Sequence, residues 1–535
     1  MFYFVPSWYH ENRYRELEQA WYVRRSVSEF DDSVKQIQLF NRNKFMDYSI
    51  ILLSFAPNFR HFLHRQGVFH APYWSCFDAI QNVSRKEVDV LSYRNLNWPE
   101  HIEFVHTPFC VVANLKDTKY AEIHFGEDGN MIEVLLFKRD QVCRKNIYDD
   151  RGFLSSSVVY REGKPVYEQY LTPKGRWKIC EFYYDGHIEV NPEESSFLMG
   201  DQLIPFSKQS YTNMEELLQE VTKVYVDQTK PEDIFCLAMH ELHHDLIESL
   251  FGNKRNILSF FQHRMELFED VELKQLMNQA SYIVSDSKNR IPQIRAYLDQ
   301  DVPIIDITPF DTRVDFGISQ QLNVQNILVP VDHMQEEVFD QLIVVLAQYL
   351  ETNHNARIHF FTRNAHWNRE NDLLGRTKEV LEAHGYNPLL ARKENENVTE
   401  NAIDTSELPK IKFFVDQCVD ELSVSKTVRL QRVLLDVTDR LDLYLIISCI
   451  STAIPQILKH PTQYVKDHKN GLYVEKLEEI SQALAYYLDG LNNWNKAMIA
   501  SYEIGKEYNT SSLIQKWKEV LRSIEQDYYT SNRSE

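Results

Sequence analysis

The chain of 535 residues is too long for one hydrophobic core, and its length predicts about two to four domains. With 43% hydrophobic and 25% charged residues it has the composition of a globular protein, which excludes a disordered or fibrous chain. A net charge of −20 repels nucleic-acid phosphates and anionic lipid, so neither is expected as a general partner.

The cysteines point to a reducing compartment. The seven are scattered, odd in number and without a CxxC pair, which favours free core thiols in a cytoplasmic protein. The first residues lack the basic leader of a signal peptide, and no apolar run reaches the roughly 18 residues that a membrane span needs. We therefore expect a cytoplasmic location and no membrane span.

The chain opens with strands and helices in alternation. Residues 2–8 read as a buried strand, and residues 10–42 carry charges among apolar positions such as Leu17, Val27 and Phe30, which suits helical structure. A continuous apolar run at 48–55 predicts a second strand. This rhythm is typical of a doubly wound parallel sheet.

The pattern changes to short alternating, aromatic segments over residues 101–205. Turn signals such as Arg151-Gly152, Glu162-Gly163 and Lys174-Gly175 recur about every eleven residues, the spacing of an antiparallel meander. We expect an antiparallel β-domain here, inserted into a first Rossmann-like lobe that spans 1–100 and 206–320.

A fresh α/β unit begins with the apolar run at 326–332, which predicts a second Rossmann-like lobe over 321–512. Two such lobes leave a cleft where the carboxyl ends of their sheets meet. Residues 513–535 form a last amphipathic helix that we expect to pack back on the first lobe. The polar segment 391–409 is predicted to be a surface loop, and the most disordered stretch of the chain.

The sharpest short motif is HExxH, at His240-Glu241-Leu242-His243-His244. In a zinc protease both histidines lie on one face of a helix and bind the metal. Residues 234–238 have strand character, however, so the helix should begin near Glu241 or later, and we interpret the motif as structural, with no metal. A helix beginning at 231–233 would instead place both histidines on one face.

Loops that bind phosphate are missing from the sequence. There is no GxGxxG and no GxxxxGK[ST], and no GxSxG elbow for a nucleophilic serine. The first strand is followed by Trp8, Tyr9 and His10, where a nucleotide-binding lobe would place glycines. These aromatic side chains suit lobe packing or a carbohydrate-stacking platform, and we expect no cofactor.

Several segments resemble a known family. Residues 432–445, 453–457 and 464–473 are similar to the donor lobe of GT-B glycosyltransferases. With the β-domain, and with the segments 1–12 and 487–495, the chain most closely resembles the family of first accessory secretory proteins of the accessory Sec system, which exports serine-rich-repeat adhesins. The resemblance implies an α/β, GT-B-like fold with two Rossmann-like lobes.

Departures from the enzymatic pattern of that fold imply a degenerate cleft. Active retaining members carry two glutamates eight positions apart in the donor lobe, but this chain has no glutamate between Glu421 and Glu475. Asp332 stands where a cation would neutralise a diphosphate, and Arg363 is the one cation at an equivalent strand end. We expect no catalytic residue and no metal ligand. The candidate ligand-binding residues of the cleft are Trp8, His10, Asp332, Arg363, Asp439 and Arg440.

The resemblance implies a non-catalytic component of an accessory secretion complex. Its expected partners are other accessory secretion proteins, the glycosylated serine-rich adhesin and the accessory SecA motor, with carbohydrate as a further candidate. The alternative is an active GT-B glycosyltransferase that modifies a serine-rich protein through an atypical nucleotide-sugar site. Membership of such a complex would also allow peripheral placement at the membrane.

Overall fold

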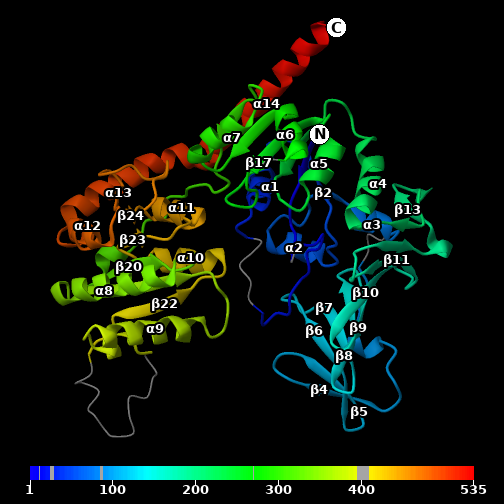
Figure 1. Ribbon diagram of the computed structural model, residues 1–535, viewed down its shortest axis with the longest axis horizontal. Helices are drawn as coiled ribbons and strands as arrows, with labels where there is room; N and C mark the ends of the chain where they lie inside the picture. The colour runs from blue at the N-terminus through cyan, green and yellow to red at the C-terminus, as the bar shows by residue number, and fades with distance from the viewer. Residues whose placement is uncertain (11, 24–28, 85–87, 269, 394–408, 535) are drawn as a thin grey trace.

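The structure, a computed structural model, describes residues 1–534 except 11, 24–28, 85–87, 269 and 394–408. Three large sheets organise it (Figure 1). Two are parallel and one is antiparallel, which confirms the predicted α/β class. Most of the segment predicted as a surface loop at 391–409 lies outside the described residues.

The first lobe is built on a seven-stranded parallel sheet. Its strands follow the order β19-β18-β17-β16-β1-β2-β3. Both faces of the sheet carry a hydrophobic cluster, which explains why its strands read as continuous apolar runs rather than alternating ones. The strands are β1 (Phe2–Val5), β2 (Tyr48–Leu52), β3 (Tyr73–Ser75), β16 (Ile234–Ala238), β17 (Arg255–Phe260), β18 (Tyr282–Ser285) and β19 (Ile304–Asp306).

Helices cover this sheet on both faces, as the βαβ rhythm requires. They are α1 (Asp32–Asn43), α2 (Phe59–Arg65), α3 (Cys76–Ile80), α4 (Met214–Val226), α5 (His244–Phe251), α6 (Val271–Gln279) and α7 (Ile291–Tyr297).

The helical structure predicted over 10–42 is wrong for most of the residues of that range that the structure describes. Helix α1 begins only after the N-cap Asp31, and the described part of the preceding segment runs as irregular chain along neighbouring strands. Arg15 forms a bridge with Phe55, and the Trp21 amide donates to the Phe125 carbonyl at 2.9 Å. Backbone pairing with distant residues replaces the helix there, while Val27 lies outside the described residues.

The β-domain is a ten-stranded antiparallel sheet inserted between β3 and β16 (Figure 1). Its order, β15-β12-β11-β10-β9-β8-β7-β6-β5-β4, is that of a meander, as the spaced turn signals predicted. Its strands are β4 (Ile102–His106), β5 (Val111–Leu115), β6 (Thr118–Phe125), β7 (Met131–Lys138), β8 (Gln141–Asp149), β9 (Phe153–Arg161), β10 (Lys164–Leu171), β11 (Trp177–Phe182), β12 (Ile188–Val190) and β15 (Ser210–Tyr211). A small hairpin, β13 (Ser196–Met199) with β14 (Gln202–Pro205), stands beside it.

The second lobe has a six-stranded parallel sheet in the order β22-β21-β20-β23-β24-β25. Its strands are β20 (Gln325–Pro330), β21 (Ala356–Thr362), β22 (Phe413–Gln417), β23 (Val433–Asp436), β24 (Gln456–Leu458) and β25 (Gly471–Tyr473). Its helices are α8 (Glu336–Thr352), α9 (Arg369–Ala383), α10 (Glu421–Val428), α11 (Leu443–Thr452), α12 (Ile480–Leu488) and α13 (Leu491–Gly505).

The last helix, α14 (Thr510–Ser534), follows α13 of the second lobe but packs on the first (Figure 1). Its side chains Leu513, Trp517, Val520 and Ile524 join the same buried cluster as Phe2 and Phe40. The rings of Trp517 and Phe40 pack edge to face with their centroids 5.5 Å apart. The described residues contain no helix that is both long and apolar enough to span a membrane. The exact domain boundaries remain predictions.

Candidate functional site

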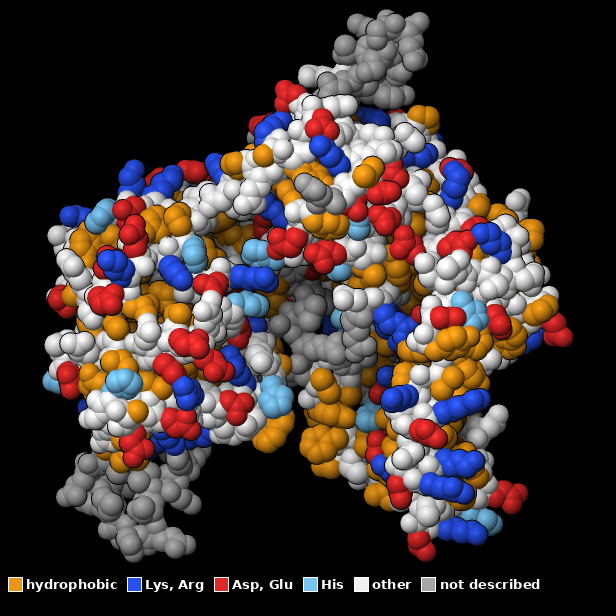
Figure 2. All heavy atoms as spheres, viewed as in Figure 1, with side chains coloured by type: hydrophobic (Ala, Val, Ile, Leu, Met, Phe, Trp, Pro, Cys, Tyr) orange, Lys and Arg blue, Asp and Glu red, His pale blue; other side chains and the backbone are white. Residues whose placement is uncertain are grey.

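The cleft between the two lobes holds a cavity of about 510 Å³. Figure 2 shows the molecule hollowed between the second lobe, on the left, and the first lobe with the β-domain, on the right. Loops at the carboxyl ends of β17, β20, β21 and β23 line the cavity, together with the residues just before α1. Both sheets therefore direct their carboxyl ends into one cleft, where ligands of doubly wound folds bind.

Asp332 lines the cleft on the second-lobe side and accepts several hydrogen bonds there. Its carboxylate accepts hydrogen bonds from the Thr362 hydroxyl at 2.7 Å and from the Arg363 amide at 2.6 Å. Arg369 lies 3.4 Å away as a further partner. The carboxylate thus fixes the loop after β21, and it also places negative charge at the edge of the cavity.

Arg363 is paired with Asp442 across the loop after β21. Its guanidinium binds both carboxylate oxygens of Asp442, with one Nη2–Oδ1 contact at 3.1 Å, and its other face lies 3.7 Å from the centroid of the Phe30 ring. Asp442 also caps α11 by accepting from the Leu445 amide at 3.0 Å. A forked guanidinium–carboxylate pair of this kind is strong and geometrically specific. It engages two of the three guanidinium nitrogens, while Nη1 is buried and makes no hydrogen bond to a described residue.

On the first-lobe side a buried arginine holds two adjacent acids. Arg264 donates to Asp31 at 3.1 Å and to Asp32 at 2.5 and 3.1 Å, and its Nε donates to the Met239 carbonyl at 2.8 Å. Burial alone would lower the pKa of Arg264, but Asp32 and Asp31 raise it above its usual value. Burial raises the pKa of Asp31 to about 6, and Asp32 adds to the rise.

Asp439 and Arg440 are exposed residues that follow β23, and Asp439 lines only the cavity next to the cleft. Asp439 is exposed and accepts from Lys459 at 3.3 Å and Gln335 at 3.1 Å, and the hydrogen bond from Lys459 lowers its pKa. Arg440 lines both the cavity of the cleft and this adjoining one of about 1090 Å³. Within the described ranges, no hydrogen bond or ion pair reaches its guanidinium. Arg440 is therefore an exposed cation of the cleft that is open to a ligand.

Trp8 and His10 do not line the cavity. Trp8 is buried against Phe59 and Phe62 and donates its indole N–H to Asp31 at 2.9 Å. His10 pairs with Glu16 at 3.0 Å. Trp8 thus supports the cleft through Asp31, and the structure brings together Asp332, Arg363 and Arg440 of the predicted residues around one cavity.

The HExxH motif straddles a strand–helix connection. Strand β16 ends at Ala238 and α5 begins at His244, so the alternative with a helix from 231–233 is wrong. His243 is buried, with its two ring nitrogens 2.7 Å from the Tyr9 hydroxyl and 2.7 Å from the Ala238 carbonyl. Burial lowers the pKa of His240 to about 4, and Arg264 lowers it further. His240 and His244 do not share a helix.

Sequence reasoning missed the buried ion pairs beside the cleft. Arg264 lies far along the chain from the acids that it binds, 232 residues from Asp32. The one local signal was Asp31 before a helix-forming stretch, which is typical of an N-cap. This signal predicts where the helix begins, but it does not identify Arg264 as the partner of Asp31.

The chain is similar to known proteins over nearly its whole length. The model of the family of accessory secretory protein 1, a protein of the accessory Sec system, matches residues 1–524. Two curated proteins of that description are 30% identical to the chain. The protein from Streptococcus gordonii aligns over 98% of this chain and 99% of its own length, and the one from Staphylococcus aureus over 97% and 99%.

Solved structures show the same fold. A chain of the Glycosylation Associate Protein (Gap123) complex from Streptococcus agalactiae is 28% identical, with a TM-score of 0.78 over 98% of this chain and 100% of that one. A chain in the structure of accessory secretory proteins 1, 2 and 3 of Streptococcus pneumoniae is 26% identical, with the same TM-score and coverage. The pneumococcal O-GlcNAc transferase GtfA is only 12% identical but reaches a TM-score of 0.65 over 98% of both chains. The predicted GT-B-like fold is thereby confirmed.

Proposed function

The chain belongs to the accessory Sec system family of accessory secretory protein 1, and we propose that it is a non-catalytic component of an accessory secretion complex. Its partners would be other accessory secretory proteins, the glycosylated serine-rich adhesin and the accessory SecA motor. The relatives in the two solved complexes, which are 26–28% identical over nearly the whole chain, support the first of these partners. The proposed location is the cytoplasm, at the membrane surface only through the complex.

The contacts that Arg363 makes with Asp442 and Phe30 support the non-catalytic part of the proposal. A glycosyl-transfer site must neutralise the diphosphate leaving group as it departs. Arg363 is bound by Asp442 and stacked on Phe30, while Asp332 faces the same space with its negative charge. Arg440 remains, but a single cation beside several carboxylates supplies little stabilisation to two departing charges.

The adhesin is proposed to bind at the flank of the β-domain. Trp21, Tyr22 and Phe109, here called the aromatic ladder, are exposed by 48%, 37% and 56% and meet edge to face at centroid distances of 5.9 and 5.3 Å. Exposed aromatic rings suit sugar faces and extended polypeptide. Strand β4, at the end of the described sheet, pairs with β5 and leaves its other edge for strand addition.

Complex formation tests the partner proposal. The purified chain is mixed with accessory secretory proteins 2 and 3 from the same organism, and the mass of the product is measured by size-exclusion chromatography with light scattering. We expect one co-eluting assembly. Elution of the chain as a separate species at micromolar concentration would contradict the proposal.

Nucleotide-sugar chemistry separates the proposal from the alternative of an active glycosyltransferase. Hydrolysis and transfer are measured with UDP-GlcNAc and a serine-rich acceptor peptide. We expect neither above the buffer rate. Transfer that Arg440→Ala abolishes while the protein stays folded would instead establish an atypical active site.

A further inference from the structure

The imidazole of His244 is held in one orientation by its own backbone. His244 is the first residue of α5 and only 9% exposed, and its Nδ1 lies 2.9 Å from the Glu241 carbonyl oxygen. A carbonyl can only accept, so Nδ1 carries a proton and donates it. In the neutral ring the lone pair then belongs to Nε2, which is buried and makes no hydrogen bond to any described residue.

Two carboxylates face that nitrogen. Asp245 Oδ1 lies 3.1 Å from Nε2 and Asp270 Oδ2 lies 3.7 Å from it. Asp270 is the N-cap of α6, and its other oxygen, Oδ1, accepts from the Leu273 amide at 2.6 Å. The cap therefore fixes the carboxylate while leaving Oδ2 directed at His244. The three ligand atoms all lie within 4.8 Å of one another.

A lone pair between carboxylate oxygens is unfavourable unless a proton or a metal cation joins them. Metal–nitrogen and metal–oxygen bonds of about 2.0–2.2 Å at tetrahedral angles place neighbouring ligand atoms roughly 3.3–3.6 Å apart. The two distances from Nε2, 3.1 and 3.7 Å, lie on either side of that range. A histidine whose second nitrogen donates to a backbone carbonyl is also the usual orientation of a metal-binding imidazole.

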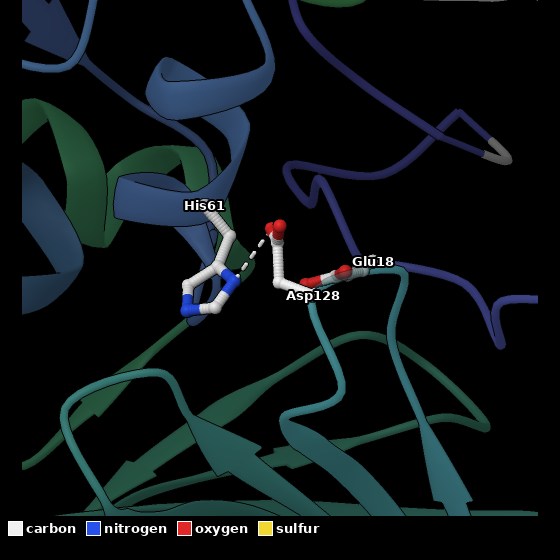
Figure 3. A group of neighbouring side chains, drawn as sticks. All are labelled: Glu18, His61 and Asp128. Carbon is white, nitrogen blue, oxygen red and sulfur yellow. Dashed lines mark hydrogen bonds and ion pairs between the residues drawn. The ribbon is translucent and has the colours of Figure 1, made fainter.

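A second cluster of the same composition shows the contrast. Glu18, His61 and Asp128 converge from the N-terminal segment, α2 and the β6–β7 turn (Figure 3), and their ligand atoms also lie within 4.8 Å. There Arg65 already supplies the cation, 2.9 Å from Glu18 and 3.5 Å from Asp128. His61 Nδ1 is engaged with Asp128 at 2.8 Å. This cluster is complete without a metal.

We propose that His244, Asp245 and Asp270 bind a divalent metal ion of the zinc class, which ties the first turn of α5 to the start of α6. The remaining positions of the ion are filled by water. The ligand set is not that of the HExxH motif, because His240 Nδ1 accepts from the Leu242 amide at 3.0 Å instead. The proposal departs from the expectation of a chain without metal, and it assigns the ion a structural role only.

Calorimetric titration of the EDTA-treated full-length protein with zinc chloride tests the site. We expect one equivalent to bind, and a rise in the unfolding temperature with it. Asp270→Asn keeps the capping oxygen of α6 but removes the charge, and it should weaken binding at least tenfold and remove the temperature rise. His244→Gln should do the same.

Two matched variants complete the test. His61→Gln in the cluster of Figure 3 and His240→Gln in the HExxH motif should both bind zinc as the unchanged protein does. The proposal is overturned if no stoichiometric zinc binds, if binding survives in folded Asp270→Asn, or if His240→Gln removes it. Binding that all four variants retain would come from exposed histidines elsewhere and would also overturn it.

Discussion

At the scale of single residues, Asp442 pairs with Arg363, a cation that lines the cleft. Asp442→Asn keeps the oxygen that caps α11 but releases the guanidinium of Arg363. We expect this variant to bind pyrophosphate about tenfold more tightly than the unchanged protein, a gain of about 1.4 kcal/mol. Calorimetry measures it, and adding Arg363→Ala should abolish the gain. Equal affinity in the two proteins would show that Asp442 does not hold the cation back.

Asp436 makes stability depend on pH. It is fully buried at the end of β23, where burial raises its pKa from 3.8 to about 7 although Thr438 donates to it at 2.6 and 3.0 Å. A carboxyl with a raised folded-state pKa contributes stability that is full below about pH 4 and is lost as the pH rises through about 7.

Asp436→Asn should remove this dependence. The free energy of unfolding, measured in urea from about pH 5 to about pH 8, should fall less steeply with pH in the variant, by on the order of 1–4 kcal/mol over that window. The amide brings an unpaired donor, but that penalty is the same at every pH. Asp201→Asn, on the surface, controls for the loss of one charge. Parallel profiles for Asp436→Asn and the unchanged protein would contradict the assignment.

At the scale of elements, α14 stabilises the first lobe through one face. Trp517 is fully buried against Phe2 and Phe40, while the next residue, Lys518, is exposed. We expect Trp517→Ala to lower the free energy of unfolding by roughly 3–5 kcal/mol. Lys518→Ala should change it by less than about 0.5 kcal/mol. Chemical denaturation measures both, and a small effect at Trp517 would mean that the helix is not needed by the first lobe.

Elements with a local signal could be predicted from the sequence, and those held by distant partners could not. The strand at 234–238 and the helix after it are clear because apolar runs and caps are local. The segment that precedes α1 is different. Buried Arg15 binds buried Glu168 of β10, 153 residues away, and this pairing keeps the segment extended where its composition suggested a helix.

The same holds for the candidate site. Apolar runs predict where parallel strands end, and Asp332 and Arg363 follow the ends of β20 and β21 and line the cleft. The partners of Arg363 could not be read in this way. Phe30 and Asp442 come from opposite lobes, and no local pattern connects them.

At the scale of the whole molecule, the aromatic ladder joins the N-terminal segment to the β-domain. Phe109→Ala removes its outer ring, which is packed on Tyr22. We expect the variant to bind a glycosylated serine-rich peptide about tenfold more weakly, because aromatic anchors dominate interfaces. Biolayer interferometry measures the affinity. Tyr184→Ala, at an exposed ring in the β11–β12 turn, should leave it unchanged. Loss of binding in both variants, or in neither, would place the peptide elsewhere.

Because α14 comes last in the chain, one face of the first sheet is covered late during synthesis. The strands of the first sheet have all left the ribosome soon after Asp306, but the helix that covers one of its faces begins only at Thr510. At about 5–20 residues per second, the ribosome needs on the order of 10–40 s to make the stretch between them. During that interval Phe2, Phe40 and their neighbours lack the cover of α14, so the nascent chain presents an apolar face to its surroundings. Chaperone binding to a stalled chain of about 500 residues should therefore exceed binding to the finished protein.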